Sequence, residues 1–235
     1  MRADSAALRV PLESARAQRW GHQRVSAPNE QGQYYCATAD TLLRHESKLE
    51  RSAMMLADRD PAVIGLSCQP VEFVWPKSAA VVTHVPDLFV RRRRGVSGLV
   101  DVHAPVRTSG GEFALQRALT NAACGDIGWS YDVFTGIGPV FEANLYWLGA
   151  YRHKRFAPSD AVLDDVRDAY RGGAPLSEGI SGLQGGPESV LPWVYHLMWS
   201  GVLRFDWEAP LRMWTAVYTS DFGGDGADEK CSASG

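Results

Sequence analysis

The sequence predicts an α/β fold, with a mixed sheet flanked by helices and a small second domain at the C-terminal end. The chain has 235 residues, of which 45% are hydrophobic and 22% are charged, as in folded globular proteins. Segments with helical apolar spacing and segments with alternating apolar residues follow one another through the middle of the chain. Three helical segments and a β hairpin fill most of the last third, which indicates a separate unit.

Residues 1–40 mix Gly, Pro, Gln and Ser without a sustained period, which predicts an irregular lead-in. The Tyr34-Tyr35 pair is the first candidate for the folded part. From residue 40 the pattern becomes helical, with one apolar stripe that runs from Leu42 through Leu56. This helix should end at Asp60-Pro61, because the residue before a proline disfavours helical geometry.

Strands and helices alternate in the next part of the chain. The expected strands are residues 62–66, 70–75, 79–90, 99–103 and 129–135. The block RRRRGVSG, residues 91–98, interrupts two of them and predicts a hairpin with a basic turn. Residues 112–123 predict a helix, and residues 144–149 belong to another. We therefore expect one domain over residues 41–157.

The C-terminal third has the element order of a winged helix. Ser159 is a candidate N-cap for a helix that closes at Gly172-Gly173. Helical segments follow at residues 176–183 and 187–200, the latter with Pro187 at its start. The β-like segments 202–207 and 213–219 complete a winged-helix-like domain over residues 158–220. Residues 221–235 are predicted to be a disordered tail.

Composition excludes several classes of function. No run approaches the roughly 20 apolar residues of a membrane-spanning helix, and the start lacks an apolar signal core. The four cysteines are scattered without a CxxC pair, which disfavours a zinc ribbon and favours a reducing cytoplasm. Neither a phosphate loop of the GxxxxGK[ST] type nor a GxSxG elbow occurs. His45, His84 and His196 lack metal-ligand spacing and should be surface or satisfied core histidines.

Charge is distributed unevenly along the chain. The formal net charge is −3, but residues 41–110 hold ten Lys and Arg against seven Asp and Glu. Residues 158–235 hold five against twelve. This asymmetry predicts two surfaces with different partners.

The predicted chemistry depends on Glu50, Asp87, Asp101 and His103. Asp101 and His103 are two apart on a strand and should face the same side. The hairpin should bring Asp87 beside them, and the preceding helix can supply Glu50. Three converging carboxylates repel one another unless a hard cation neutralises them, and oxygen-only ligands select Mg²⁺ or Mn²⁺.

These residues occur in the order of the PD-(D/E)xK nuclease signature, which they resemble. The segments SKLERSAMMLADRDPAVIGLSCQPVEFVW, HVPDLFV and LVDVHAP resemble the TnsA-like endonuclease subunits of heteromeric transposases, over roughly residues 44–156. HLMWSGVLRFDWEAPL resembles the winged-helix-like end of that family. The resemblance implies a restriction-endonuclease-like fold and Mg²⁺- or Mn²⁺-dependent cleavage of one DNA strand at transposon ends. It also implies a bacterial, cytoplasmic, nucleoid-associated protein that works with a DDE transposase and an ATPase regulator.

The resemblance assigns roles residue by residue. Glu50, Asp87 and Asp101 would be metal ligands, with the Val102 carbonyl as a candidate fourth. Glu46 is the rival of Glu50, which the family's Ser-x-x-Glu spacing favours.

The family's last motif residue is lysine, and here it is His103. A histidine with its ordinary pKa of about 6.5 is mostly neutral at pH 7, yet it can orient or deprotonate a water. Alternatively the site is weakened or inactive, or Arg152 or Lys154 replaces the missing lysine.

Basic residues near the predicted site are candidates for DNA contacts. Those in the hairpin turn can clamp phosphates, although a solvated turn is the simpler interpretation. The candidates are Arg91, Arg92, Arg93, Arg94, Arg152 and Lys154.

The C-terminal domain is predicted to dock a protein rather than DNA. No Lys or Arg occurs from Ala174 through Leu203, which includes the helix that would enter a major groove. Trp193, Tyr195 and Trp199 fit core packing or a protein partner, here the transposase or the ATPase regulator.

Two other functions fit the same residues. One is a stand-alone nuclease of restriction or repair, which would cut DNA without partners. The other is a catalytically silent adaptor that binds DNA and a partner but no metal.

Overall fold

The structure is a computed structural model that describes residues 5–18, 30–77, 80–105 and 111–220. Contacts divide the chain into two compact units, Met1–Gly136 and Ile137–Gly235, which are described separately. The predicted tail, with Cys231, lies outside the described residues. The predicted α/β class is confirmed, since both units combine helices with sheets.

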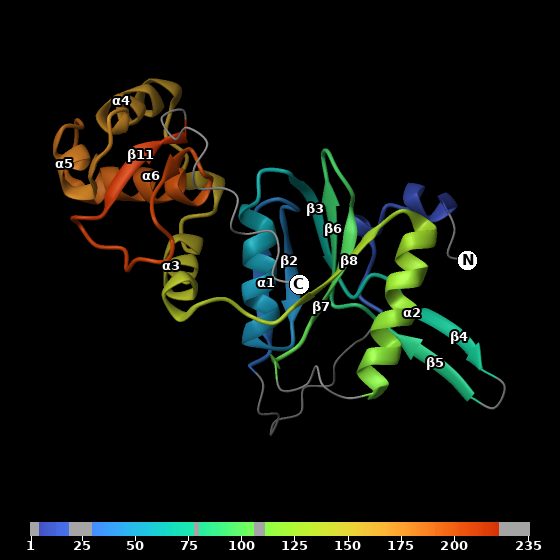
Figure 1. Ribbon diagram of the computed structural model, residues 1–235. Helices are drawn as coiled ribbons and strands as arrows, with labels where there is room; N and C mark the ends of the chain where they lie inside the picture. The colour runs from blue at the N-terminus through green and yellow to red at the C-terminus, as the bar shows by residue number, and fades with distance from the viewer. Residues whose placement is uncertain (1–4, 19–29, 78–79, 106–110, 221–235) are drawn as a thin grey trace. The chain divides into compact units, whose positions relative to one another are not determined.

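A four-stranded mixed sheet forms the centre of the first unit (Figure 1). Its strands, in spatial order, are β3 (Val63–Cys68), β6 (Leu88–Arg92), β7 (Gly98–Val102) and β8 (Ser130–Phe134). The first three are antiparallel, as the predicted hairpin requires, whereas β7 and β8 are parallel. A parallel pair needs a long crossover, and α2 (Gly111–Ile127) lies in that connection.

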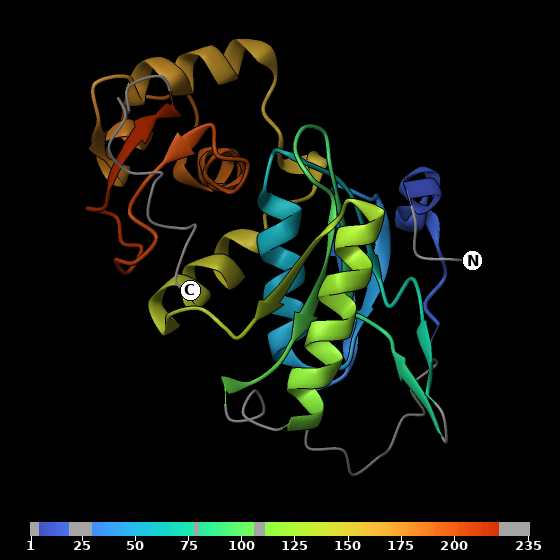
Figure 2. The same ribbon diagram turned by 45° about the vertical axis from the view of Figure 1, so that its right-hand side comes forward.

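One helix covers each face of this sheet (Figures 1 and 2). Phe89 and Leu99 lie in an apolar cluster with Ala123 and Cys124 of α2. Because side chains alternate along a strand, their neighbours face the opposite side, where α1 (Lys48–Arg59) contacts β3 and β7.

The helix α1 begins later than the sequence predicts. Thr41–His45 is strand β2, which pairs antiparallel with β1 (Gly32–Cys36), and Leu42 is 59% exposed instead of lying in a helical stripe. The helix starts only after Ser47, whose hydroxyl accepts the N–H of Glu50. Its predicted end before Pro61 is confirmed.

Part of the predicted irregular lead-in is folded. Two 3₁₀ helices, η1 (Ser5–Arg9) and η2 (Leu12–Ser14), bury Ala7 and Leu12 in the apolar cluster beneath α2. The expected extended segments 70–75 and 79–90 become β4 (Phe73–Lys77), β5 (Ala80–His84) and β6. The first two form a separate antiparallel ribbon.

The second unit packs helices against a small three-stranded sheet. The helices are α3 (Pro139–Gly149), η4 (Lys154–Phe156), α4 (Asp160–Tyr170), α5 (Leu176–Ser181) and α6 (Pro187–Trp199). The sheet, in spatial order, contains β10 (Leu203–Arg204), β11 (Ala216–Thr219) and β9 (Ala174–Pro175). The helix, helix, helix and hairpin order matches the prediction, with β9 as an added strand.

The boundary between the units lies before α3, not at the predicted residue 157. The helix α3 contacts α6, and the Tyr151 carbonyl lies 2.8 Å from Nδ1 of His196 on α6. These contacts join residues 137–157 to the second unit. Tyr195 and Trp199 are buried, which agrees with core packing, whereas Trp214 is 76% exposed.

None of the helices in the described ranges is both long enough and apolar enough to cross a membrane.

Candidate active site

Three carboxylates near the start of α1 and the start of β6 are close enough for their charges to act on one another, and we call them the acidic cluster. The acidic cluster consists of Glu46, Glu50 and Asp87. Glu50 lies in the first turn of α1, and Asp87 directly precedes β6. None of the ion pairs in the described part of the chain involves Glu50 or Asp87.

Glu50 is held by a local motif at the helix N-terminus. Its carboxylate accepts the Glu46 N–H at 2.8 Å and the Ser47 hydroxyl at 3.1 Å. The Ser47 hydroxyl in turn accepts the Glu50 N–H, so Ser47-x-x-Glu50 works as a capping box. Burial raises the pKa of Glu50, and the two hydrogen bonds oppose that rise. The motif therefore fixes the position of this carboxylate.

Asp87 is held by the neighbouring strand. Its carboxylate accepts the N–H of Val102 at 2.7 Å, and its backbone carbonyl accepts the N–H of Gln69. The pKa of Asp87 is raised to about 7, chiefly by burial and in addition by the nearby charges of Glu50, Asp101 and Glu46, while the hydrogen bond from Val102 opposes the rise. A carboxylate in such surroundings is costly to ionise unless a cation arrives.

Asp101 occupies a different environment from the one predicted. Its carboxylate is 1% exposed and lies 2.8 Å from Nε2 of His84, and it also accepts the Tyr131 hydroxyl. Gln116 of α2 contacts Nδ1 of the same histidine. Asp101 therefore faces α2, and its oxygens have hydrogen-bonding partners there.

The sequence did not reveal the partner of His84. It is a satisfied core histidine, as predicted, but its partner is one of the expected metal ligands. The alternation along β5 places it on the inner face, and no sequence spacing identifies Asp101 as its partner.

His103 lies on the same side of the sheet as Asp101, as the two-residue spacing predicts. Its ring packs edge-on against Phe113 of α2, with centroids 4.5 Å apart. The backbone N–H of His103 donates to the Phe134 carbonyl and extends the pairing with β8.

The predicted metal ligands fit a hard divalent cation in part. The charge of Glu50 acts on Asp87, and neither carboxylate has an ion pair among the described residues, which suits Mg²⁺ or Mn²⁺. The oxygens of Asp101 are already engaged by His84 and Tyr131. Within the described ranges, no three His, Cys, Asp or Glu side chains form a ready metal site. The ligand role of the Val102 carbonyl stays a prediction.

The four arginines of the predicted turn separate into two pairs. Arg91 and Arg92 belong to β6: Arg91 pairs with Glu13 at 2.9 Å, and Arg92 pairs with Asp60 at 2.5 Å. Arg93 and Arg94 are exposed in the turn. Arg93 and Arg94 are therefore the more accessible pair for a DNA contact.

The remaining basic candidates belong to the second unit. Lys154 is exposed in η4, and Arg152 is half-buried and donates to the Gly149 carbonyl. Both therefore belong to a different unit from the acidic cluster.

Comparison with protein-family models finds no matching family, and comparison with curated proteins finds no match.

Proposed function

We propose that this chain is a Mg²⁺- or Mn²⁺-dependent DNA endonuclease, the TnsA-like subunit of a heteromeric transposase, which cuts one strand at transposon ends. The observation that carries the proposal is the acidic cluster. Two neighbouring carboxylates, Glu50 and Asp87, have no cationic partner in the described residues, and Asp87 has its pKa raised to about 7. The order of helix Glu, PD segment, hairpin and D-x-basic strand supports the same function.

Each residue has a role in this proposal. Glu50 and Asp87 would hold the cation. The bound cation would lower the pKa of a water and stabilise the charge on the scissile phosphate. The capping box orients Glu50, and the Val102 N–H orients Asp87. His103 would orient or deprotonate the attacking water, in place of the family's lysine.

Asp101 acts in this proposal as the residue that holds His84 and Tyr131. This arrangement also favours a second candidate function, the catalytically silent adaptor. With Asp101 engaged and a histidine at the position of the lysine, the same fold would bind DNA and a partner without hydrolysis. Metal binding separates the two functions, because only the endonuclease requires it.

The second unit supports a protein-docking role. No Lys or Arg occurs from Ala174 through Leu203, a range that contains α6. Trp214 presents an exposed aromatic side chain. We propose that this unit binds the transposase or the ATPase regulator.

A nicking assay tests the proposed activity. Supercoiled plasmid DNA is incubated with Mn²⁺ and the full chain, alone and with the partner proteins, and open circles are counted on a gel. We expect the Asp87→Asn variant to lose more than about 100-fold of the wild-type rate, because it removes a metal ligand. Asp132→Asn, a change at an exposed position of β8, is the matched control. Equal rates for wild type and Asp87→Asn would refute the proposal.

A further inference from the structure

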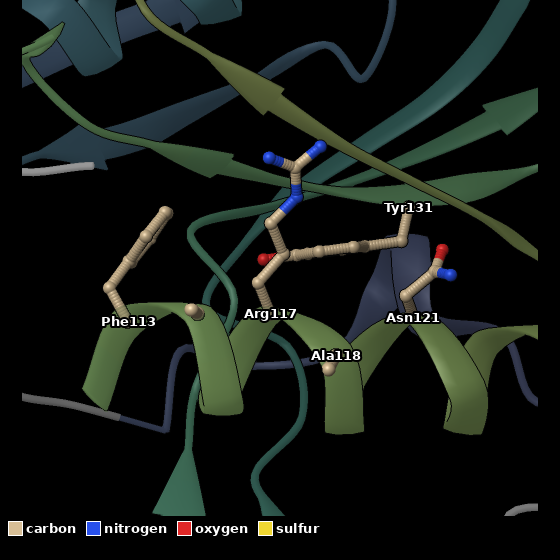
Figure 3. Close-up of a pocket in the computed structure, with 6 residues that line it drawn as sticks. Phe113, Arg117, Ala118, Asn121 and Tyr131 are labelled. Atoms are coloured by element: carbon tan, nitrogen blue, oxygen red, sulfur yellow. The ribbon is translucent and has the colours of Figure 1, made fainter. Parts of the chain in front are cut away.

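A groove opens between α2 and the edge strand β8 on the side of the sheet that carries Asp101. It has a volume of about 330 Å³, within the range of small-ligand sites. Phe113, Arg117 and Asn121 rise from one side of α2 toward Tyr131 of β8 (Figure 3). The three helix residues are four apart and therefore form a single stripe.

Two polar side chains of α2 that line this groove, Arg117 and Asn121, are not engaged by other described residues. Arg117 is exposed and has no carboxylate within 4.0 Å among the described residues. Asn121 is also exposed, and its side chain makes no hydrogen bond in the same ranges. Arg91 and Arg92, by contrast, are both paired. A guanidinium and an amide are thus free to bind an anion.

The inner wall of the groove is rigid. The Tyr131 hydroxyl donates to the buried Asp101, which His84 also contacts. Burial and this hydrogen bond raise the pKa of Tyr131, so the phenol stays protonated and keeps donating. The Tyr131 ring is therefore held in place before any ligand arrives, which lowers the entropic cost of binding against it.

We propose that this groove binds one unpaired nucleotide, with its base against the rings of Phe113 and Tyr131 and its phosphate on Arg117 and Asn121. Aromatic rings beside a cation are the usual means of holding single-stranded nucleic acid, because every base has a face to stack. Phe113 also contacts His103, so the groove adjoins the proposed catalytic residue. The inference rests on the proposed function in taking a DNA strand as the source of the nucleotide.

Binding in the absence of metal tests the groove by itself. The full chain is titrated in EDTA into a fluorescently labelled thymidine oligonucleotide, and anisotropy gives the Kd. We expect Arg117→Ala to raise the Kd about 10-fold and Phe113→Leu about 3-fold, from the loss of a phosphate contact and of stacking. Arg212→Ala, at an exposed arginine of the second unit, is the control and should stay within about 2-fold of wild type. Thermal unfolding checks that the variants fold.

The source of the nucleotide is decided by competition. Displacement of the oligonucleotide by thymidine monophosphate would support a site for the free nucleotide, and its failure would support a site that needs the strand. The inference is overturned if wild type binds neither probe, or if Arg117→Ala and Phe113→Leu bind like wild type. Asp87→Asn should abolish nicking and leave this binding intact. Loss of one result without the other therefore shows which proposal has failed.

Discussion

Replacing Asp87 by asparagine should stabilise the metal-free protein at pH 8. The pKa of Asp87 rises from its ordinary value of 3.8 to about 7 because the carboxyl is buried beside other carboxylates. The pKa rises by about three, and each pKa unit corresponds to about 1.4 kcal/mol. Ionising Asp87 therefore lowers the free energy of unfolding by at most about 4 kcal/mol. Asp87 is half-buried, so screening by solvent reduces this figure, and we expect about 1 to 3 kcal/mol.

The sign follows from proton linkage. Because the folded state binds the proton of Asp87 more tightly than the unfolded state does, the stability it contributes is present at low pH. It is lost as the pH rises from about 4 to about 7. Asparagine has no charge to bury and keeps an oxygen that can accept the N–H of Val102. The variant should therefore be more stable than wild type at pH 8, and the difference should nearly vanish at pH 4.

Urea unfolding in EDTA at pH 4, 6 and 8 measures these differences, with Asp132→Asn as the control at an exposed carboxylate. The reasoning is refuted if Asp87→Asn is less stable than wild type at pH 8, or if the difference does not change with pH.

Three further predictions concern buried contacts and paired charges within the two units. Asp58→Ala should cost about 2 to 4 kcal/mol of unfolding free energy, because this buried carboxylate accepts four hydrogen bonds from the strand β1 and the turn after it; unchanged urea unfolding would contradict this. Gly179→Ala should lower the Tm by several degrees, since the added methyl would overlap the buried ring of Tyr170, and a Tm equal to wild type would argue against this packing. Arg91→Ala should lower the free energy of unfolding by about 1 to 2 kcal/mol, because Arg91 is paired. Arg94→Ala should leave stability unchanged and weaken DNA binding at low salt. The reverse pattern in unfolding and anisotropy assays would contradict the division of the arginines into a paired and an exposed set.

Much of the local structure could be predicted because it depends on local signals. The end of α1 before Pro61, the hairpin of β6 and β7, and the order of elements in the second unit all follow from such signals. The start of α1 was predicted too early because Leu42 fits a helical stripe and a strand equally well. The capping box at Ser47 was the stronger signal, and it marks the observed start.

The arrangement of the site could be predicted only in part. The two-residue spacing correctly puts Asp101 and His103 on one side of the sheet, but it cannot say which helix covers that side. Packing decides this, and it brings Asp101 against α2 and His84 while Glu50 comes from α1. The partners of Arg91 and Arg92 come from distant segments, so a run of arginines gives no sign that two of them are paired.

Titration of the metal-free chain with Mn²⁺, followed by electron paramagnetic resonance of the free ion, tests the acidic cluster most directly. We predict that wild type removes Mn²⁺ from solution at one saturable site, and that Glu50→Gln and Asp87→Asn each abolish this binding while Asp132→Asn preserves it. Wild-type protein that takes up no Mn²⁺, or an Asp87→Asn variant that takes up as much as wild type, would contradict the account.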